Sequence, residues 1–216
     1  MKLFLTSAGL TNNKIAEAFS NLVGLPSHEI KIAFIPTASN VEEGDKGWLI
    51  DDYTNLRRQD YNSVDIVDIS ALPQEIWKPR LELANVLFLG GGNTFHLMHW
   101  VKESGLEKML PDLLKTRVYA GISAGSCIAG PTIYNSVQNL FGEKYNLKIE
   151  KGLGLVNFQF IPHLNSKYFP KIRKQYLEDA AKDLTEPIYA VDDETALMVR
   201  GDKIEVISEG KWSKFN

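Results

Sequence analysis

The 216-residue sequence has little cysteine, little net charge of one sign and no long hydrophobic run. Its single cysteine, Cys127, excludes an intramolecular disulfide and any metal site built from several cysteines. Lysine and arginine (24) are slightly outnumbered by aspartate and glutamate (27), so the net charge of −3 offers no basic surface to a nucleic acid. No apolar stretch approaches the length of a membrane-spanning helix. We therefore expect a cytoplasmic protein with neither a nucleic-acid nor a membrane partner.

What the chain does have is an alternation of short apolar runs with segments of helix-like spacing. Strands are predicted at Lys2–Leu5, Lys31–Ile35, Val64–Ile69, Val86–Leu89 and Val118–Ile122. Helices are predicted in the intervening segments at Asn12–Leu22, Gly47–Gln59, Thr94–Ser104 and Leu106–Lys115. Strands that are apolar throughout are typical of parallel sheets covered on both faces. With 44% hydrophobic residues, the chain is predicted to form one α/β domain over residues 1–216, doubly wound around a mostly parallel central sheet.

The last third of the chain spaces its elements differently. Strands are predicted at Leu155–Pro162, Ile188–Val191, Ala196–Val199 and Lys203–Ile207, with a helix at Lys171–Leu184. The last two strands are separated by Arg200-Gly201-Asp202, which predicts an antiparallel hairpin at the edge of the sheet.

Polar and glycine-rich loops follow the predicted strands. In an open α/β sheet, ligands bind outside the carboxyl ends of the strands, so these loops mark the expected site. They are Ser7-Ala8-Gly9, Pro36-Thr37-Ala38, Gly90-Gly91-Gly92-Asn93, the loop at Ser123, Pro162-His163 and Asp192-Asp193-Glu194.

The most informative motif is the stretch 118–130, VYAGISAGSCIAG, in which an apolar strand leads into small residues. A serine in the pattern G-x-S-x-G is typical of a nucleophile elbow, a sharp turn that exposes the hydroxyl. Gly121 and Gly125 would let the chain turn tightly, which makes Ser123 a candidate nucleophile. A helix cap or a phosphate-binding loop is the alternative for the same pattern. Cys127 is predicted to be a buried small residue rather than a reactive thiol.

A serine hydroxyl becomes a strong nucleophile when a base takes its proton, and the usual base is a histidine. Of the four histidines, His28 lies in a polar turn, and His96 and His99 lie on a predicted helix. His163 instead follows the apolar run LVNFQFIP, at the carboxyl end of a predicted strand. It is therefore the candidate base, with a hydrogen-bonded structural histidine as the alternative.

Three neighbouring acids follow the predicted strand at 188–191 and could orient this histidine: Asp192, Asp193 and Glu194. Successive residues of an extended chain face opposite ways, so at most one of the three should point at the histidine. A solvated turn is the alternative for all three. The chain order of an α/β-hydrolase would instead require an acid between the serine and the histidine, where Glu143 and Glu150 are available.

The run Gly90-Gly91-Gly92-Asn93-Thr94 ends one predicted strand and begins a helix. Three glycines let main-chain N–H groups approach a ligand closely, while Asn93 or Thr94 can cap the helix. One loop N–H and the N–H of Ala124 would together suit an oxyanion hole. A mononucleotide phosphate site is the alternative, although the chain lacks the P-loop pattern and the final glycine of G-x-G-x-x-G.

In this order, GGGNTF, GISAGS, IPH and a late acidic turn make the chain similar to the peptidase family of aspartyl dipeptidase (peptidase E) and cyanophycinase. The resemblance spans most of the chain. It implies a fold of the class I glutamine amidotransferase type and a serine peptidase with a Ser-His-acid site and no metal or organic cofactor. By position it implies Ser123 as the nucleophile, His163 as the base, and Gly92 and Ala124 as the oxyanion donors.

The orienting acid departs from this family. Asp193 aligns where the family usually has a glutamate, which is one methylene longer. Either the backbone lies closer to the histidine here, or Asp192 or Glu194 takes the place of Asp193.

Substrate specificity is predicted from three further positions. Arg173, in IRKQY, aligns with the arginine that the aspartyl dipeptidase uses for an acidic side chain, and a guanidinium can bind a carboxylate in two places. Gln138 falls near the aspartate of that enzyme's loop after the elbow, so a contact with the substrate amine would be weaker here. Asn93, beside the glycines, is a third candidate for substrate binding.

The predicted function is that of a serine peptidase acting on dipeptides or small peptides, with an acidic N-terminal residue as one candidate preference. An esterase or amidase is the first alternative, because the same site attacks any accessible acyl carbonyl. A small-molecule-binding protein with an ineffective triad is the second, because fold alone does not establish function. The sequence leaves a monomer and a homodimer equally open.

Overall fold

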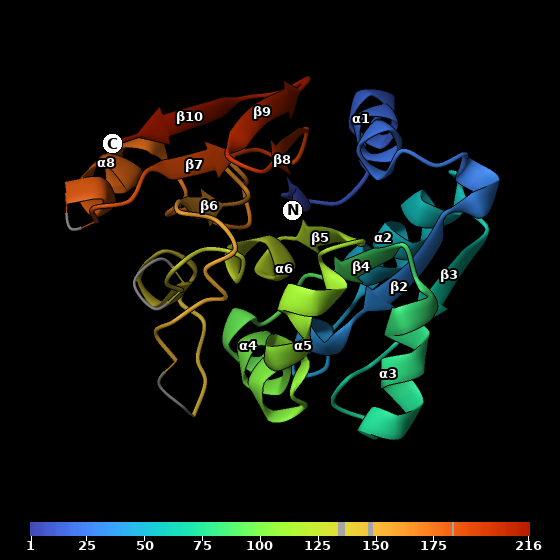
Figure 1. The fold of residues 1–216 in the computed structure, drawn as a ribbon. Helices are drawn as coiled ribbons and strands as arrows, with labels where there is room; N and C mark the ends of the chain where they lie inside the picture. Colours follow the sequence, from blue (N-terminus) through green and yellow to red (C-terminus); the bar gives the residue numbers. More distant parts are fainter. Residues whose placement is uncertain (134–136, 147–148, 183) are drawn as a thin grey trace.

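A seven-stranded sheet forms the centre of the molecule (Figure 1). The computed structural model describes the whole chain except residues 134–136, 147–148 and 183. The strands lie in the order β3-β2-β4-β5-β1-β8-β9. Their bounds are β1 Lys2–Thr6, β2 Lys31–Ile35, β3 Ser63–Ile66, β4 Val86–Leu89, β5 Val118–Ile122, β8 Thr195–Arg200 and β9 Lys203–Ser208. The pairs from β3 to β1 are parallel and β8–β9 is an antiparallel hairpin at the edge, which confirms the predicted fold class.

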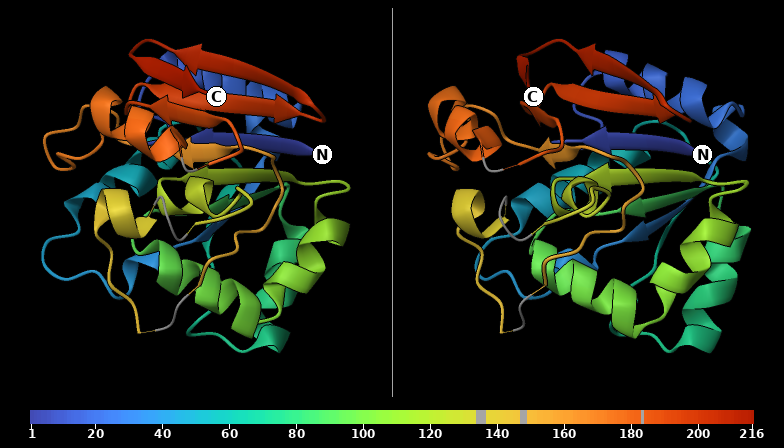
Figure 2. Two further views of the ribbon diagram at one scale, coloured as in Figure 1. Left: turned by 90° about the vertical axis from the view of Figure 1, so that its left-hand side faces the viewer. Right: turned by 60° about the vertical axis from the view of Figure 1, so that its left-hand side comes forward.

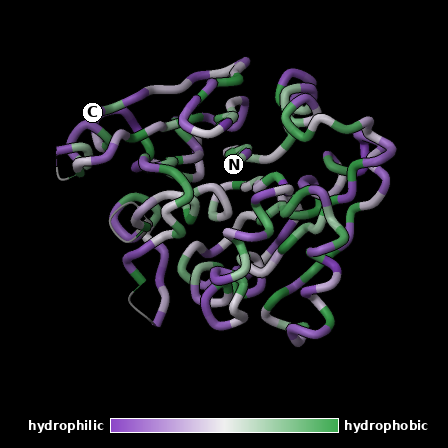
Figure 3. Tube along the Cα trace, in the orientation of Figure 1, coloured by the Kyte–Doolittle hydropathy of each residue, from purple (hydrophilic) through white to green (hydrophobic). Residues whose placement is uncertain are grey.

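Helices cover both faces of this sheet because alternate residues of each strand point to opposite sides. The helices that follow the first strands are α1 Asn13–Val23, α2 Gly47–Arg57, α3 Gln74–Leu83, α4 Thr94–Glu103 and α5 Leu106–Leu113. In β2, Phe34 belongs to a buried cluster with residues of α1 and α2, whereas its neighbour Ile35 belongs to a cluster with residues of α3, α4 and α5. Figure 3 shows the hydrophobic character of the central strands that supply both clusters. Within the described residues, no helix is both long enough and apolar enough to cross a membrane.

Some elements differ from the prediction. The structure has a helix, α3, that the sequence did not predict; this helix contains Pro79, a residue that ordinarily interrupts a helix. Strand β3 ends at Ile66, so the apolar residues Val67 and Ile69 are buried in the loop that follows rather than in the strand. Burial of an apolar run therefore does not require that it be a strand.

A second, three-stranded sheet lies beside the first, in the order β10-β7-β6 (Figures 1 and 2). Its elements are β6 Gln159–Ile161, β7 Ile188–Val191 and β10 Trp212–Phe215, and helix α8 Lys174–Lys182 accompanies it. Of the strand predicted at 155–162, only the last part forms, and β10 is absent from the prediction. Apolar residues of α8, β6 and β7 share a third buried cluster, so this small sheet has its own hydrophobic support.

The register of β1 brings several loops to one edge of the large sheet. Thr6, the last residue of β1, lies opposite Ile122 in the parallel pair with β5 and opposite Ala196 in the antiparallel pair with β8. The residues that follow β1 and β5 therefore meet those that precede β8. The Ser123 N–H donates to the Thr6 carbonyl at 3.0 Å and fixes the start of the next turn at this edge.

Candidate active site

Ser123 occupies a strained turn between β5 and the short helix α6 (Ala124–Cys127). Its φ and ψ are 47° and −107°, in a region that costs a residue other than glycine about 1–3 kcal/mol. A β-carbon placed on Gly121 would lie 2.6 Å from the Gly125 carbonyl oxygen, and one placed on Gly125 would lie 2.1 Å from the Leu89 carbonyl oxygen. Both glycines of the G-x-S-x-G motif are therefore needed for the close backbone packing that holds the serine in this turn.

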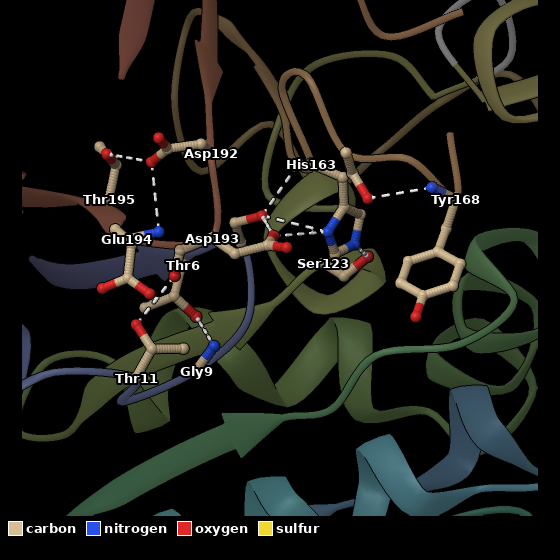
Figure 4. Close-up of polar contacts among 12 residues, drawn as sticks. Thr6, Gly9, Thr11, Ser123, His163, Tyr168, Asp192, Asp193, Glu194 and Thr195 are labelled. Carbon is tan, nitrogen blue, oxygen red and sulfur yellow. Dashed lines mark hydrogen bonds and ion pairs between the residues drawn. The ribbon is translucent and has the colours of Figure 1, made fainter. Parts of the chain in front are cut away.

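Ser123, His163 and Asp193 are joined by two hydrogen bonds (Figure 4). Oγ of Ser123 lies 3.0 Å from Nε2 of His163, and Nδ1 of the same ring lies 2.7 Å from Oδ1 of Asp193. An ionised carboxylate can only accept, so Nδ1 carries the proton that is donated to it. In the neutral ring, Nε2 then accepts from the serine hydroxyl, which is the geometry a general base needs.

The surroundings of Asp193 favour its ionised form. Burial by itself raises the pKa of Asp193, but the hydrogen bond and charge of His163, together with a hydrogen bond from Ser7, outweigh burial and lower that pKa below its usual value. The main-chain oxygen of Asp193 also accepts from the Thr11 hydroxyl at 2.8 Å. This carboxylate is therefore ionised and fixed in position at neutral pH.

The two acids beside Asp193 have other partners. Asp192 accepts hydrogen bonds from the Thr195 hydroxyl (2.8 Å) and from the Glu194 N–H (3.2 Å), within the turn before β8. The Glu194 carboxylate accepts a hydrogen bond of 2.8 Å from the side chain of Asn12, and Asn12 caps the N-terminus of α1. Of the three acids, Asp193 is the one that the fold brings to the histidine.

Glu143, the alternative acid between the serine and the histidine, lies at the start of α4. Its carboxylate accepts from the N–H (2.6 Å) and the hydroxyl (2.9 Å) of Thr94. Burial raises the pKa of Glu143 to about 7, against the lowering effect of the Thr94 hydrogen bonds. Glu143 thus caps a helix, and Glu150, the other alternative, has an exposed side chain.

Ser7 is a buried residue of the site that the sequence did not single out. Its Oγ accepts from the His163 main-chain N–H at 2.8 Å and donates to Oδ1 of Asp193 at 2.6 Å. It lies directly after β1, in one of the loops expected at the carboxyl edge. Its role depends on the β1–β5 register, which only the three-dimensional structure supplies. The Ser7 hydroxyl therefore joins the main chain of the base to the acid, and its Oγ also lies 3.3 Å from Nδ1 of the His163 ring.

We expect Ser7→Ala to lower kcat by up to about 100-fold, because displacements near 1 Å at a catalytic group can have an effect of that size. The thermal midpoint and kcat should be measured together, with Ser20→Ala as a control. Ser20 is partly buried, and its hydroxyl likewise forms a hydrogen bond, with that of Tyr61. Wild-type kcat in a folded Ser7→Ala protein would show that the Ser7 hydrogen bonds do not position His163 and Asp193.

The glycine loop after β4 runs directly beside the nucleophile. A β-carbon placed on Gly91 would lie 3.5 Å from Cβ of Ser123. The N–H groups of Gly90 and Asn93, on either side, donate to main-chain carbonyls at and just after the end of β2, at 2.9 Å each. Both ends of the loop are therefore anchored while its middle faces the serine.

The two predicted oxyanion donors lie in suitable segments. Gly92 has φ +127°, and a β-carbon there would lie 2.3 Å from the Ala38 carbonyl oxygen, so the position requires glycine. Ala124 is the first residue of α6, directly after the serine. Within the described part of the chain, neither N–H donates a hydrogen bond to a protein acceptor. Both remain available to a ligand oxygen.

The loop that carries His163 is braced by Phe169 and Arg173. The Phe169 ring stacks on the imidazole, with centroids 4.6 Å apart and planes 16° from parallel. The Arg173 guanidinium donates to the main-chain oxygens of Ser166 (2.9 Å), Phe169 (3.1 Å) and Ile172 (2.9 Å). These bonds leave part of its donor set for a ligand, since a guanidinium has five N–H groups.

Two further predicted binding residues lie at different places. The Asn93 side chain accepts from the His96 N–H at 2.9 Å and caps α4, which is the alternative role considered for it. Gln138 lies in the π-helical turn η3 (Val137–Phe141) with an exposed side chain.

Cys127 is buried, and burial raises the pKa of its thiol, as expected for an unreactive cysteine.

Comparison with known proteins gives concordant matches. The model of peptidase family S51 matches residues 3–207. An uncharacterized peptidase of Listeria monocytogenes is 29% identical over 209 residues, covering 94% of this chain and 96% of that protein. Peptidase E of a Nostoc species is 36% identical over 135 residues, which are 57% of this chain and 52% of that protein. The crystal structure of a candidate peptidase E from Listeria monocytogenes has a TM-score of 0.80 at 25% identity, covering 97% of this chain and 98% of that one.

Proposed function

The chain belongs to peptidase family S51 and is a serine-type peptidase, and we propose that it hydrolyses dipeptides and other small peptides with Ser123 as the nucleophile. His163 acts as the general base and Asp193 orients it. The observation that carries this proposal is the 3.0 Å contact between Oγ of Ser123 and Nε2 of His163, at a strained turn on the carboxyl edge of the sheet. The ionised Asp193 carboxylate on the other ring nitrogen supports the same assignment.

In the acylation step, Oγ of Ser123 attacks the scissile carbonyl carbon while Nε2 of His163 takes the hydroxyl proton. Asp193 keeps the imidazole in the tautomer that can accept this proton and stabilises the imidazolium that forms. The carbonyl oxygen becomes an oxyanion, which the Gly92 and Ala124 N–H groups would stabilise. Removal of a single oxyanion donor costs about 100- to 1,000-fold in kcat in enzymes of this kind.

Collapse of the tetrahedral intermediate breaks the C–N bond. The imidazolium gives its proton to the leaving amine, and the acyl group stays on Ser123 as an ester. Water then attacks the ester with His163 again as the base, which releases the acid product and restores the serine. None of these steps calls for a metal or an organic cofactor.

A scan of dipeptides for release of free amine tests this function directly. We expect the wild-type protein to release the second amino acid from at least one class of dipeptide, and the Ser123→Ala protein to release none at the same concentration. Hydrolysis of simple esters without hydrolysis of any peptide would instead favour an esterase.

We also propose that Arg173 binds an acidic first residue of the substrate through its remaining N–H groups. Arg173→Met should then lower kcat/KM for Asp-Leu about 10- to 100-fold more than for Ala-Leu, the range expected for one charge-assisted contact. Lys174→Met is the matched control, because Lys174 is the next residue, also cationic, and pairs with Glu178 on the surface of α8. Equal losses of kcat/KM for the two dipeptides would show that Arg173 only stabilises the loop that carries His163.

A further inference from the structure

One face of α2 lies against the nucleophile and carries two residues that the proposed chemistry does not use. Trp48 and Asp52 are four residues apart, so they share a side of this helix. A β-carbon placed on Gly91 would lie 3.7 Å from Cζ3 of Trp48 and 3.5 Å from Cβ of Ser123. Trp48 is 39% exposed. An aromatic ring open to solvent therefore stands beside the serine.

Asp52 lies one helical turn further along, on the inner side of α2. A β-carbon placed on Gly9 would lie 3.3 Å from Oδ1 of Asp52 and 3.2 Å from Cδ1 of Ile122. Ile122 directly precedes Ser123, and its Cγ2 would lie 3.8 Å from a β-carbon on Gly91. The side chain of Ile122 thus reaches from the neighbourhood of Asp52 to the glycine loop beside Ser123.

Asp52 is a buried residue whose carboxyl has no partner among the described residues. The residue is 7% exposed, and no hydrogen bond or ion pair to its side chain occurs within the described part of the chain. Asp68, an acid that is only half-buried, accepts hydrogen bonds from Thr37, Asn40 and Ser70. Its pKa falls despite its burial, because these hydrogen bonds outweigh desolvation. Asp52 therefore lacks the hydrogen bonds that offset the desolvation of Asp68.

An unpaired buried carboxylate is costly, and a cation would remove that cost. Burial first, and then the charge of Asp51, raise the pKa of Asp52 to about 8. Burial first, and then the Asp52 charge, raise the pKa of Tyr53, the next residue on the same helix. The residues packed against Asp52 from β5 and the loop after β1, Ile122 and Gly9, are uncharged. The charge of Asp51, which contributes to this rise, is negative, as an ammonium ion beside Asp52 would not be.

We propose that Asp52 binds the ammonium group of the substrate, with the Trp48 ring as the adjoining wall of the same subsite. The proposal rests on the proposed function, in which Ser123 attacks the carbonyl of the substrate's first residue. In a dipeptide the α-ammonium is separated from that carbonyl by one carbon, so it must lie close to the elbow. A carboxylate and an aromatic ring face are both groups that attract an ammonium ion.

The cation can come from two sources, an N-terminal α-ammonium or a lysine side chain. Three peptides distinguish them: Ala-Leu carries the first, N-acetyl-Lys-Leu carries the second, and N-acetyl-Ala-Leu carries neither. Their binding should be measured by calorimetry in the Ser123→Ala protein, with and without Asp52→Asn. Because no hydrolysis is needed, this result is independent of whether the wild-type protein proves to be a peptidase.

We expect Asp52→Asn to weaken binding of Ala-Leu by about 10- to 100-fold, the range for loss of a charge-assisted contact, and to leave N-acetyl-Ala-Leu unchanged. Asp51→Asn is the matched control, because this neighbouring acid is exposed; through its charge effect on Asp52 it should change the affinity for Ala-Leu by no more than a few-fold, and that for N-acetyl-Ala-Leu not at all. A loss confined to N-acetyl-Lys-Leu would assign the subsite to the lysine side chain. An Asp52→Asn protein that binds all three peptides as before, or weakens all three equally, would overturn the proposal.

A second measurement tests the same subsite without a substitution of Asp52. An ammonium beside Asp52 must lower its pKa, so binding of Ala-Leu at pH 7 should release protons from a carboxyl that burial holds largely protonated. Calorimetry in two buffers of different ionisation enthalpy measures this release, with N-acetyl-Ala-Leu as the reference. Equal proton release with the two peptides would contradict the assignment even if Asp52→Asn failed to fold.

Discussion

The Ser123→Ala protein is expected to fold normally and to hydrolyse peptides about a millionfold more slowly than the wild type. The substitution removes the atom that forms the acyl bond, while the elbow keeps its backbone contacts through Gly121 and Gly125. Among the described residues, the one hydrogen-bond partner of the serine side chain is His163, 3.0 Å away, so the thermal midpoint should change little. Single-turnover hydrolysis of a good dipeptide, measured beside a melting curve, provides both quantities.

Cys127→Ala is the control for a thiol nucleophile in the same motif. Cys127 is buried on α6, with Sγ 3.5 Å from the main-chain oxygen of Phe160. Its replacement should leave kcat near that of the wild type. Retention of activity by Ser123→Ala together with loss in Cys127→Ala would transfer the nucleophile's role to the thiol and refute the mechanism.

The second large effect is expected at Asp193. Conversion of the orienting carboxylate to an amide leaves the geometry intact but allows the wrong imidazole tautomer, which lowers kcat by about ten-thousandfold in a serine protease. Asp193→Asn should have an effect of this order, because Asp193 accepts the Nδ1 hydrogen bond at 2.7 Å. The measurement is kcat at neutral pH, where the lowered pKa of Asp193 keeps the wild-type carboxylate ionised.

The neighbouring acids provide matched controls for this prediction. Asp192→Asn and Glu194→Gln should retain kcat within a few-fold, because the first acid binds the Thr195 hydroxyl and the second binds Asn12. Inactivity of Glu194→Gln with an active Asp193→Asn would mean that the turn rearranges when substrate binds. Full activity in all three would show that His163 works without a carboxylate from this turn.

Much of this arrangement could be predicted from local patterns. Apolar runs at the first five strands indicated a parallel sheet, and in such a sheet the loops that follow must share one edge. Gly121 and Gly125 were informative because the close packing they allow is a local property of the turn. His163 was identifiable because it ends an apolar run, although only its last three residues before Pro162 form β6.

What could not be predicted depends on contacts between distant segments. Ser7 reaches Asp193 across 186 positions of the sequence, through a strand register that no local pattern encodes. The choice among the three late acids follows from the turn that Asp192 stabilises by its own hydrogen bonds. Arg173 resembles a ligand-binding arginine in sequence, yet its contacts to carbonyls of the neighbouring loop could be seen only in three dimensions.

Activation of Ser123 by His163 is tested most directly with a fluorophosphonate probe. Such a probe reacts covalently with an activated serine whatever peptide the enzyme prefers. Intact-protein mass spectrometry followed by peptide mapping should find one adduct per chain, located on Ser123, and far slower labelling of a His163→Ala protein. No adduct on the folded wild-type protein, or an adduct at another residue, would contradict the assignment of Ser123 as the activated nucleophile.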